Sequence, residues 1–252
     1  MCSSDLLKFV LLLALALVAL PLLSSPVAAA DGEVDSGDTA WLMISTGLVF
    51  IMTPAVAFFY GGMVRKSNFL SMLGQSILII GVVTIIWVVF GYSLTFGTDN
   101  GGLIGGTEYI MLNGVDISPN LIAPTVPHIL FMMYQGMFAI LTVALIIGGV
   151  AERMKLSSLM VFLGIWTAAV YIPVAHWVWG GGWIYDLGAL DFAGGTVVHI
   201  TAGVSVLAAA LVLGKRINLA KGGQEVPHNV PMVVLGGALL WIRSEEHTSE
   251  LQ

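Results

Sequence analysis

Long, predominantly apolar segments dominate this sequence and leave little choice of fold. The run Ala193–Leu213 contains no Asp, Glu, Lys or Arg, and it matches the ~20 residues that an α-helix needs to cross a bilayer. Comparable runs are Trp41–Met63, Phe69–Phe96, Ile129–Val150 and Leu156–Trp177. These runs predict an all-α polytopic membrane protein with five complete spans.

A histidine lies one third of the way into the run Ala193–Leu213. Gly195, His199 and Gly203 are spaced four apart, so they share one face of a helix. The two glycines let another helix or a ligand approach the backbone closely. A titratable side chain at membrane depth indicates a functional site. The alternative is a core histidine bonded to a neighbouring hydroxyl, and the spacing alone leaves both interpretations open.

The composition agrees with a membrane protein and argues against several other classes. Charged residues make up 10% of the chain, against roughly 25% in soluble domains. The single cysteine, Cys2, lies in a segment that we expect to be removed, which argues against disulfides, zinc sites and thiol chemistry. The sequence has no phosphate-binding loop, zinc-protease motif or nucleophile elbow. We therefore expect no enzymatic activity, no cofactor or metal, and no nucleic-acid partner.

Both ends of the chain differ from the membrane domain between them. Residues 1–30 combine Lys8, a short apolar core and small residues before a cleavage point after Ala30, which predicts a cleaved signal peptide. A first membrane helix is the alternative. Residues 243–252 are polar, interrupt an apolar helix and resemble a translated sequencing adapter, so we expect a non-native tail. The membrane domain is then 31–242. Its sixth span, Val230–Ile242, would be truncated, because it covers only about 20 Å of a ~30 Å bilayer core.

Basic residues between the spans predict the orientation of the chain in the membrane. They occur in alternate connections only, at Arg65, Lys66, Arg153, Lys155, Lys215, Arg216 and Lys221. The short acidic leader before the first span, the loop 97–123 and the connection 178–191 contain no Lys or Arg. By the positive-inside rule the basic connections are cytoplasmic. A cleaved signal peptide independently places the mature N-terminus outside, so we expect a protein of the inner (plasma) membrane.

Aromatic and acidic residues gather toward the predicted outer side. Tyr134 and Phe138 are four apart and stack on one helix face, where they either attract a small cation or pack at the membrane interface. The stretch Trp177–Trp183 holds three tryptophans and a triple glycine, which suits an aromatic belt or a turn that holds one ring over an opening. His176 is interpreted as a structural or solvated histidine. Asp191 suits an N-cap of the fifth helix, with a substrate-facing carboxylate as the alternative.

Five stretches of the sequence carry a family resemblance. They are Phe59–Gly62, Tyr134–Ala139, Ala151–Arg153, His176–Gly182 and Gly188–His199. Together they resemble the Amt/MEP/Rh ammonium transporters, and the bacterial Amt branch in particular. The resemblance covers Gly37–Ile242 in order. It implies the N-terminal half of an eleven-helix channel with an inverted repeat, assembled as a homotrimer. It also implies ammonium or ammonia as substrate, methylammonium as an analogue, and a PII-type cytoplasmic regulator as a candidate partner.

The same resemblance assigns roles to individual residues. Tyr134 and Phe138 match the outer and deeper aromatic positions of the external vestibule, and Trp179 matches its tryptophan. The tyrosine departs from the commoner phenylalanine but keeps the ring. Asp191 matches an essential acid, and His199 matches the first of two pore histidines. The second histidine, the second gate phenylalanine and the vestibule serine would follow the sixth span. The 252 residues alone are therefore expected neither to conduct ammonium nor to form a stable trimer.

The sequence leaves two other functions open. An Amt-like domain joined to a C-terminal signalling domain would be an ammonium sensor, and the coding sequence after the sixth span would distinguish the two. A haem protein with ligands among His128, His176 and His199 is less consistent with the sequence. Haem sites in helical bundles need histidines that converge at one depth, whereas His128 and His176 fall near the outer ends of their spans.

Overall fold

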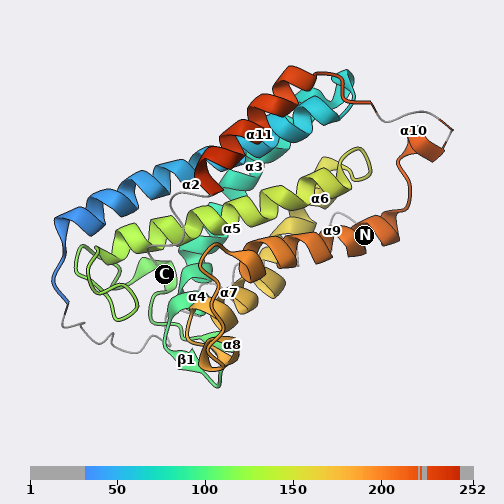
Figure 1. Cartoon of the computed structure of the whole chain (residues 1–252). Coiled ribbons are helices and arrows are strands. Elements are labelled where there is room, and N and C mark those ends of the chain that lie inside the picture. The colour runs from blue at the N-terminus through green and yellow to red at the C-terminus, as the bar shows by residue number, and fades with distance from the viewer. Residues whose placement is uncertain (1–31, 221, 223–225, 245–252) are drawn as a thin grey trace.

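The computed structural model describes residues 32–220, 222 and 226–244 (Figure 1). The predicted signal peptide and residues 245–252 of the predicted tail lie outside the described residues. Within them, five helical segments are long and apolar enough to cross a membrane. They are Ser36–Met63, Lys66–Phe96, His128–Val150, Leu156–Asp186 and Gly195–Leu213. The predicted polytopic helical fold with five spans is therefore confirmed.

Short elements and local changes of helix type divide these spans. The first two spans comprise α2 (Ser36–Met63), η2 (Lys66–Asn68), α3 (Phe69–Ile86), η3 (Trp87–Gly91) and α4 (Tyr92–Phe96). The loop 97–123 holds β1 (Asp99–Asn100), β2 (Ile104–Gly105) and η4 (Ile110–Leu112). The remaining elements are α5 (His128–Val150), α6 (Leu156–Trp166), η5 (Thr167–Tyr171), α7 (Ile172–Trp179), α8 (Trp183–Asp186), η6 (Gly195–Ile200), α9 (Thr201–Leu213), α10 (Ile217–Ala220) and α11 (Val230–Ser244).

The first helix begins five residues before the predicted span, at Ser36 rather than Trp41. Asp35 explains the difference, because its carboxylate accepts a hydrogen bond of 2.8 Å from the backbone N–H of Asp38. This contact satisfies one of the free amides of the first helical turn. Part of the acidic leader is therefore helical and continuous with the first membrane span.

Three spans contain a π-helical turn, which the sequence did not predict. These turns are η3, η5 and η6. The first two lie against each other: the ring centroids of Trp87 and Tyr171 are 6.3 Å apart. At Gly91, an added Cβ would lie 3.2 Å from the Ile172 side chain, so this side chain packs directly against the Gly91 backbone. Single π turns inside α-helices are frequent at functional sites, and η6 carries His199.

Helix α5 forms the centre of the bundle, with α2 and α9 beside it (Figure 1). Its apolar stretch is 72% buried, against 17% for the segment Gly195–Leu213. Most side chains of the fifth span are therefore not covered by the other helices that the structure describes. Helix α11 packs along α2, and Gly236 allows this contact, because an added Cβ would lie 2.5 Å from the backbone nitrogen of Phe59.

The basic connections lie together at one end of the bundle. Arg65 Nε forms an ion pair of 3.0 Å with Glu152, and Arg153 Nη1 donates to the carbonyl of Gly214 at 2.9 Å. Burial raises the pKa of Glu152, but hydrogen bonds from Arg65 and Asn68 outweigh this effect and hold the pKa below its usual range. These contacts tie three alternate connections to one another, as the charge pattern requires.

The loops without basic residues lie at the opposite end. There the backbone N–H of Asp35 donates to the carbonyl of Thr125 at 2.8 Å. The backbone N–H of Trp183 donates to the carbonyl of Gly102 at 3.0 Å. Which end faces the cytoplasm stays a prediction from the charge distribution. In keeping with that prediction, we call the end without basic loops the outer end.

Cysteine labelling tests that orientation. Ser67 and Asn113 are both exposed and lie in connections of opposite type. In a Cys2→Ser background, Ser67→Cys should react with a membrane-impermeant maleimide only after lysis, because basic loops face the cytoplasm. Asn113→Cys should react in intact cells. Reaction of both variants in intact cells would contradict the orientation.

Candidate functional site

Three aromatic side chains from two spans stack in succession near the outer loops. Tyr134 and Phe138, both on α5, have ring centroids 5.0 Å apart at an interplanar angle of 90°. Phe138 and Trp179 of α7 have centroids 5.8 Å apart at 66°. Both α5 rings are 1% exposed. Such edge-to-face contacts suit the charge distribution of aromatic rings, so Phe138 packs against the Trp179 ring and restricts its position.

Asp191 joins Trp179 to the start of the fifth span. The indole N–H of Trp179 donates to the backbone carbonyl of Asp191 at 3.0 Å. The Asp191 carboxylate accepts from the N–H groups of Thr196 and Val197 at 2.9 and 3.0 Å. The predicted contacts of Asp191 with the first helical turn are therefore present, although the residue in the N-cap position is Gly194, at φ +72°. The carboxylate reaches the first turn from further upstream because the left-handed Gly194 bends the chain back.

Trp179 also lines an outer cavity of about 360 Å³. Deep in the wall lie Phe96, Phe131, Gln135 and Val178, and the loop around α8 supplies much of the rim. The complete lining is Phe96, Ile122, Phe131, Gln135, Val178, Trp179, Tyr185, Ala189, Leu190, Asp191 and Phe192. Aromatic faces with one acid and one amide suit a small cation better than an anion or a large apolar ligand. Gln135 is a site residue that the sequence analysis did not single out.

His199 lies at a separate hollow, not in the outer cavity. Its side chain is exposed and lines a space of about 250 Å³ with Tyr60, Leu145, Gly149, Ala202, Gly203 and Val206. The predicted closeness of His199 and Gly203 is thus present. On α5, Gln135 lines the outer cavity and Leu145, ten residues later, lines the second hollow, so these two residues are about 15 Å apart along the helix. The buried ring of Phe138 lies between these two residues in the chain, and the buried ring of Tyr134 directly precedes Gln135.

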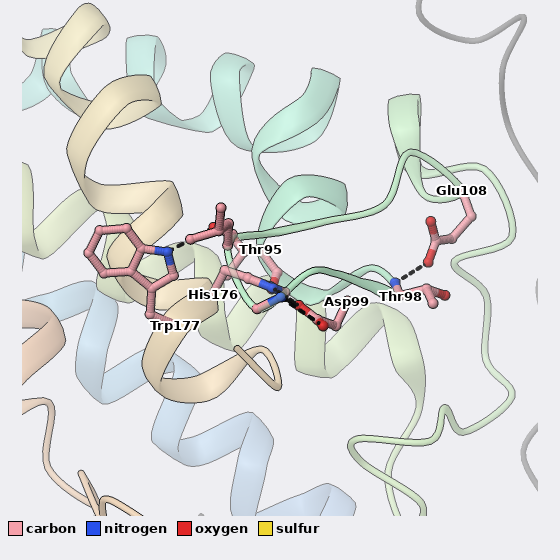
Figure 2. Close-up of polar contacts among 8 residues, drawn as sticks. Thr95, Thr98, Asp99, Glu108, His176 and Trp177 are labelled. Atoms are coloured by element: carbon pink, nitrogen blue, oxygen red, sulfur yellow. Dashed lines mark hydrogen bonds and ion pairs between the residues drawn. The ribbon is translucent and has the colours of Figure 1, made fainter. Parts of the chain in front are cut away.

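His176 fixes the end of α7 that carries Trp179 (Figure 2). Its side chain is fully buried, with Nδ1 2.8 Å from the carbonyl oxygen of Thr95 and Nε2 2.9 Å from Oδ1 of Asp99. Trp177 donates from its indole N–H to the carbonyl of Leu103 at 2.8 Å. In the same loop, Glu108 accepts a hydrogen bond from the backbone N–H of Thr98. His176 is therefore structural and is not solvated.

The three histidines considered as haem ligands do not converge. His128 Nε2 lies 2.5 Å from the hydroxyl of Tyr92, and His176 contacts Asp99 and Thr95. His199 lines the second hollow, beside Tyr60 and Leu145, which we call the inner hollow. Among residues 32–220, 222 and 226–244, no group of three or more His, Cys, Asp or Glu side chains could hold a metal ion.

Comparison with known proteins decides the family. The model of the Ammonium Transporter Family matches residues 40–243. The chain belongs to this family. An ammonium transporter of Bacillus subtilis is 51% identical over 205 residues, which cover 81% of this chain and 50% of the relative. Ammonium transporter Amt1 of Archaeoglobus fulgidus is 45% identical over 208 residues, covering 82% of this chain and 51% of the relative.

Two solved structures share the fold. The crystal structure of Candida albicans Mep2 matches with a TM-score of 0.76 at 41% identity, over 83% of this chain and 47% of that one. A structure described as "Sensor Amt Protein" matches with a TM-score of 0.73 at 27% identity, over 81% of this chain and 52% of that one. The predicted family is confirmed. The chain spans about half the length of the relatives it matches.

The Asp99–His176 pair predicts an acid-sensitive outer loop. Hydrogen bonds from His176 and from the Gly102 N–H lower the pKa of Asp99. A lowered carboxyl pKa stabilises the folded loop above the usual carboxyl range, and this stabilisation is lost as pH falls through the lowered value. Asp99→Asn should reduce hydrogen-exchange protection of residues 97–106 at neutral pH and abolish the acid-dependent step. The exposed Asp186 provides the control, because Asp186→Asn should retain both the hydrogen-exchange protection and its acid-dependent loss. Unchanged protection in Asp99→Asn would contradict the role of the pair.

Proposed function

We propose that the chain is the N-terminal part of an ammonium transporter, not an enzyme, and that it recruits ammonium at the outer cavity beside Trp179. The observation that carries this proposal is the stack of Tyr134, Phe138 and Trp179, in which the two buried α5 rings support Trp179 at the cavity wall. Ammonium is strongly hydrated, and leaving water for an apolar lumen costs several kcal/mol without compensating contacts. The face of an aromatic ring returns about 0.5–2 kcal/mol to a cation at such a site.

Beyond the cavity, the proposed path favours the neutral molecule. The buried rings of Phe138 and Tyr134 form an apolar barrier on the α5 side, where ammonia crosses more easily than ammonium. Ammonium would therefore release its proton at the vestibule. Ammonia would cross the lumen, and the proton would pass separately along a hydrogen-bonded route that includes the pore residue His199. Potassium carries the same charge as ammonium but has no proton to lose. It cannot become neutral, so this path excludes it. Asp191 acts by holding the start of the fifth span and the Trp179 indole.

The cellular setting follows from the same proposal. The protein would lie in the inner (plasma) membrane as a multi-pass protein with its mature N-terminus outside, after removal of residues 1–30. A homotrimer of full-length chains and a PII-type cytoplasmic regulator are the proposed assembly and partner. Methylammonium is the substrate analogue for measurement.

An ammonium sensor is the second candidate function. The likeness to the structure described as "Sensor Amt Protein" favours considering it, at 27% identity and a TM-score of 0.73. Sensing and transport would share the outer cavity, so the described site supports both. The coding sequence after residue 242 distinguishes them: a signalling domain there would favour the sensor, and a second histidine span ending in a short tail would favour the transporter.

Two tryptophans at the outer end separate a cation site from a general aromatic belt. Trp179 lines the cavity, whereas Trp183 is 45% exposed and contacts Trp177. Trp179→Leu should weaken methylammonium binding to the purified chain about fivefold, because it removes a cation–π contact of ~1 kcal/mol. Trp183→Leu should change affinity less than twofold. Equal losses in both variants would favour a belt, and the absence of binding to the native chain would reject the proposed function.

A transport assay on a longer, chimeric chain tests the role of His199. Residues 32–242 are joined to the C-terminal half of the Bacillus subtilis relative, so that the chimera has the full length of the family's proteins. His199→Ala should abolish or change electrogenic ammonium uptake while assembly is retained, because it removes the titratable group from the inner hollow. His228→Ala is the matched control, since His228 instead contacts the carbonyl of Val64 at the basic end. Unchanged currents and unchanged ammonium-over-potassium selectivity would reduce His199 to a packing residue.

A further inference from the structure

The imidazole of His176 lies between two hydrogen-bond acceptors. Its Nδ1 is 2.8 Å from the carbonyl oxygen of Thr95, and its Nε2 is 2.9 Å from Oδ1 of Asp99. The carbonyl can only accept, and the lowered pKa of Asp99 keeps its carboxyl ionised, so that it also can only accept. A neutral imidazole has one N–H, whereas the imidazolium has two. The two contacts together therefore require a doubly protonated, positively charged His176.

The surroundings of His176 suit that charge. The side chain is fully buried, so solvent cannot reach the ring to replace either hydrogen bond. His176 also lies in the last turn of α7, where the helix carbonyls favour a cation. Loss of one proton would leave a ring lone pair facing an acceptor, and an unpaired buried polar group is costly. Deprotonation should therefore break one of the two contacts.

Asp99 is the charged partner of His176. The elements that pack most extensively against α7 are α4, η5, α8, β2 and η6. Glu108, in the same loop as Asp99, instead accepts from the backbone N–H of Thr98. Within the described part of the chain, none of the titratable side chains on the five elements forms a hydrogen bond or ion pair with His176; they are Tyr92, Tyr171, Tyr185, Asp186 and His199.

His176 connects two helix ends that form part of the wall of the outer cavity. Thr95 directly precedes Phe96, and Trp179 follows His176 by three residues on α7; the rings of Phe96 and Trp179 line the cavity. Gly180 permits this close packing, because an added Cβ would lie 2.0 Å from the carbonyl oxygen of Thr95 and 2.6 Å from Nδ1 of His176. The imidazole therefore holds the end of α4 against the end of α7.

Asp99 adds the loop segment 97–106 to this junction. Its carboxylate accepts from the backbone N–H of Gly102 at 2.9 Å. The carbonyl of Gly102 in turn accepts from the backbone N–H of Trp183, the first residue of α8. Helix α8 carries Tyr185 at the rim of the cavity. The contact between Asp99 and His176 thus joins the rim of the cavity to its wall.

We propose that His176 is a positioning residue of the outer cavity and acts as a pH-dependent latch. As an imidazolium it ties Thr95 and the loop segment 97–106 to α7, and it releases one of these contacts when it loses its proton. The stabilisation of the loop by His176 is present at low pH and is lost as pH rises through the deprotonation of His176. Protonation of Asp99 limits the latch on the acid side. This inference goes beyond the proposed function, because the latch does not require ammonium.

NMR measures the protonation state of the ring directly. The 252-residue chain is prepared in lipid nanodiscs with ¹⁵N-labelled histidine and followed from about pH 5 to 9, which includes the range in which histidine ordinarily titrates. Both ring nitrogens of His176 should carry a proton at the acid end, and one should lose it as pH rises. His128 is the internal control, because its ring is also buried but its Nε2 contacts the hydroxyl of Tyr92, which can donate. His128 should remain neutral.

Hydrogen exchange reports whether the loop follows the ring. Protection of residues 97–106, corrected for the intrinsic exchange rate, should fall about tenfold or more as His176 loses its proton, because a hydrogen bond to a charged group is lost. Asp99→Asn should leave His176 with a single protonated nitrogen at the acid end, since the introduced amide can donate to Nε2. Asp186→Asn removes an exposed acid on α8 and is the matched control. It should retain both ring protons and the alkaline step in protection.

His176→Gln tests the effect on the cavity. The amide keeps a hydrogen-bond donor but cannot be charged, so loop protection should lose its alkaline step. Methylammonium remains a cation over this pH range. Its affinity for the native chain should fall as His176 deprotonates, and this fall should be absent in His176→Gln. The native titration and Asp99→Asn keep the inference testable if His176→Gln fails to fold.

The outcomes separate the latch from the proposed function. A His176 ring that holds one proton, or two, over the whole pH range would overturn the latch. Loop protection that stays constant while His176 deprotonates would also overturn it. A native chain that shows the proton loss and the fall in protection but does not bind methylammonium would support the latch and reject the outer cavity as a cation site.

Discussion

The hydrogen bonds of Asp191 hold together the two spans on which the outer site depends. Its carbonyl fixes the indole of Trp179 at the end of α7, and its carboxylate satisfies free amides at the start of η6. Backbone amides at the beginning of a membrane helix are costly to leave unpaired. The same residue therefore stabilises the fifth span and orients the ring that faces the cavity. The need to pair these backbone amides therefore also sets the position of Trp179 at the cavity.

Much of the fold could be predicted from the sequence, because apolar length and charge placement are strong constraints in a bilayer. The predicted limits of the third span, Ile129–Val150, differ from α5 by one residue. The π turns could not be predicted, since the shift from i−4 to i−5 hydrogen bonds leaves no residue signature. The earlier start of α2 depends on the Asp35 cap, which becomes decisive only once the leader folds back on the outer loop.

The site was predictable where it follows one helix and unpredictable where distant segments meet. The spacing of Tyr134 and Phe138 predicted their stacking, but the contact between Phe138 and Trp179 depends on how α5 packs against α7. The burial of His176 depends on Asp99, seventy-seven residues earlier in the chain. The turn sequence Asp99–Gly102 was the available signal. Gln135 was missed because a glutamine within a conspicuous aromatic motif reads as an ordinary polar residue until its surroundings are known.

Direct contact between ammonium and the aromatic stack tests the central claim most simply. Solid-state NMR can measure dipolar transfer from ¹⁵N-ammonium to ¹³C-labelled tryptophan rings of the chain in a bilayer. A cation site at the outer cavity predicts transfer to Trp179 that disappears in Trp179→Leu, with no comparable transfer to Trp183. Equal transfer to both rings, or transfer that persists in Trp179→Leu, would contradict a cation site at the outer cavity.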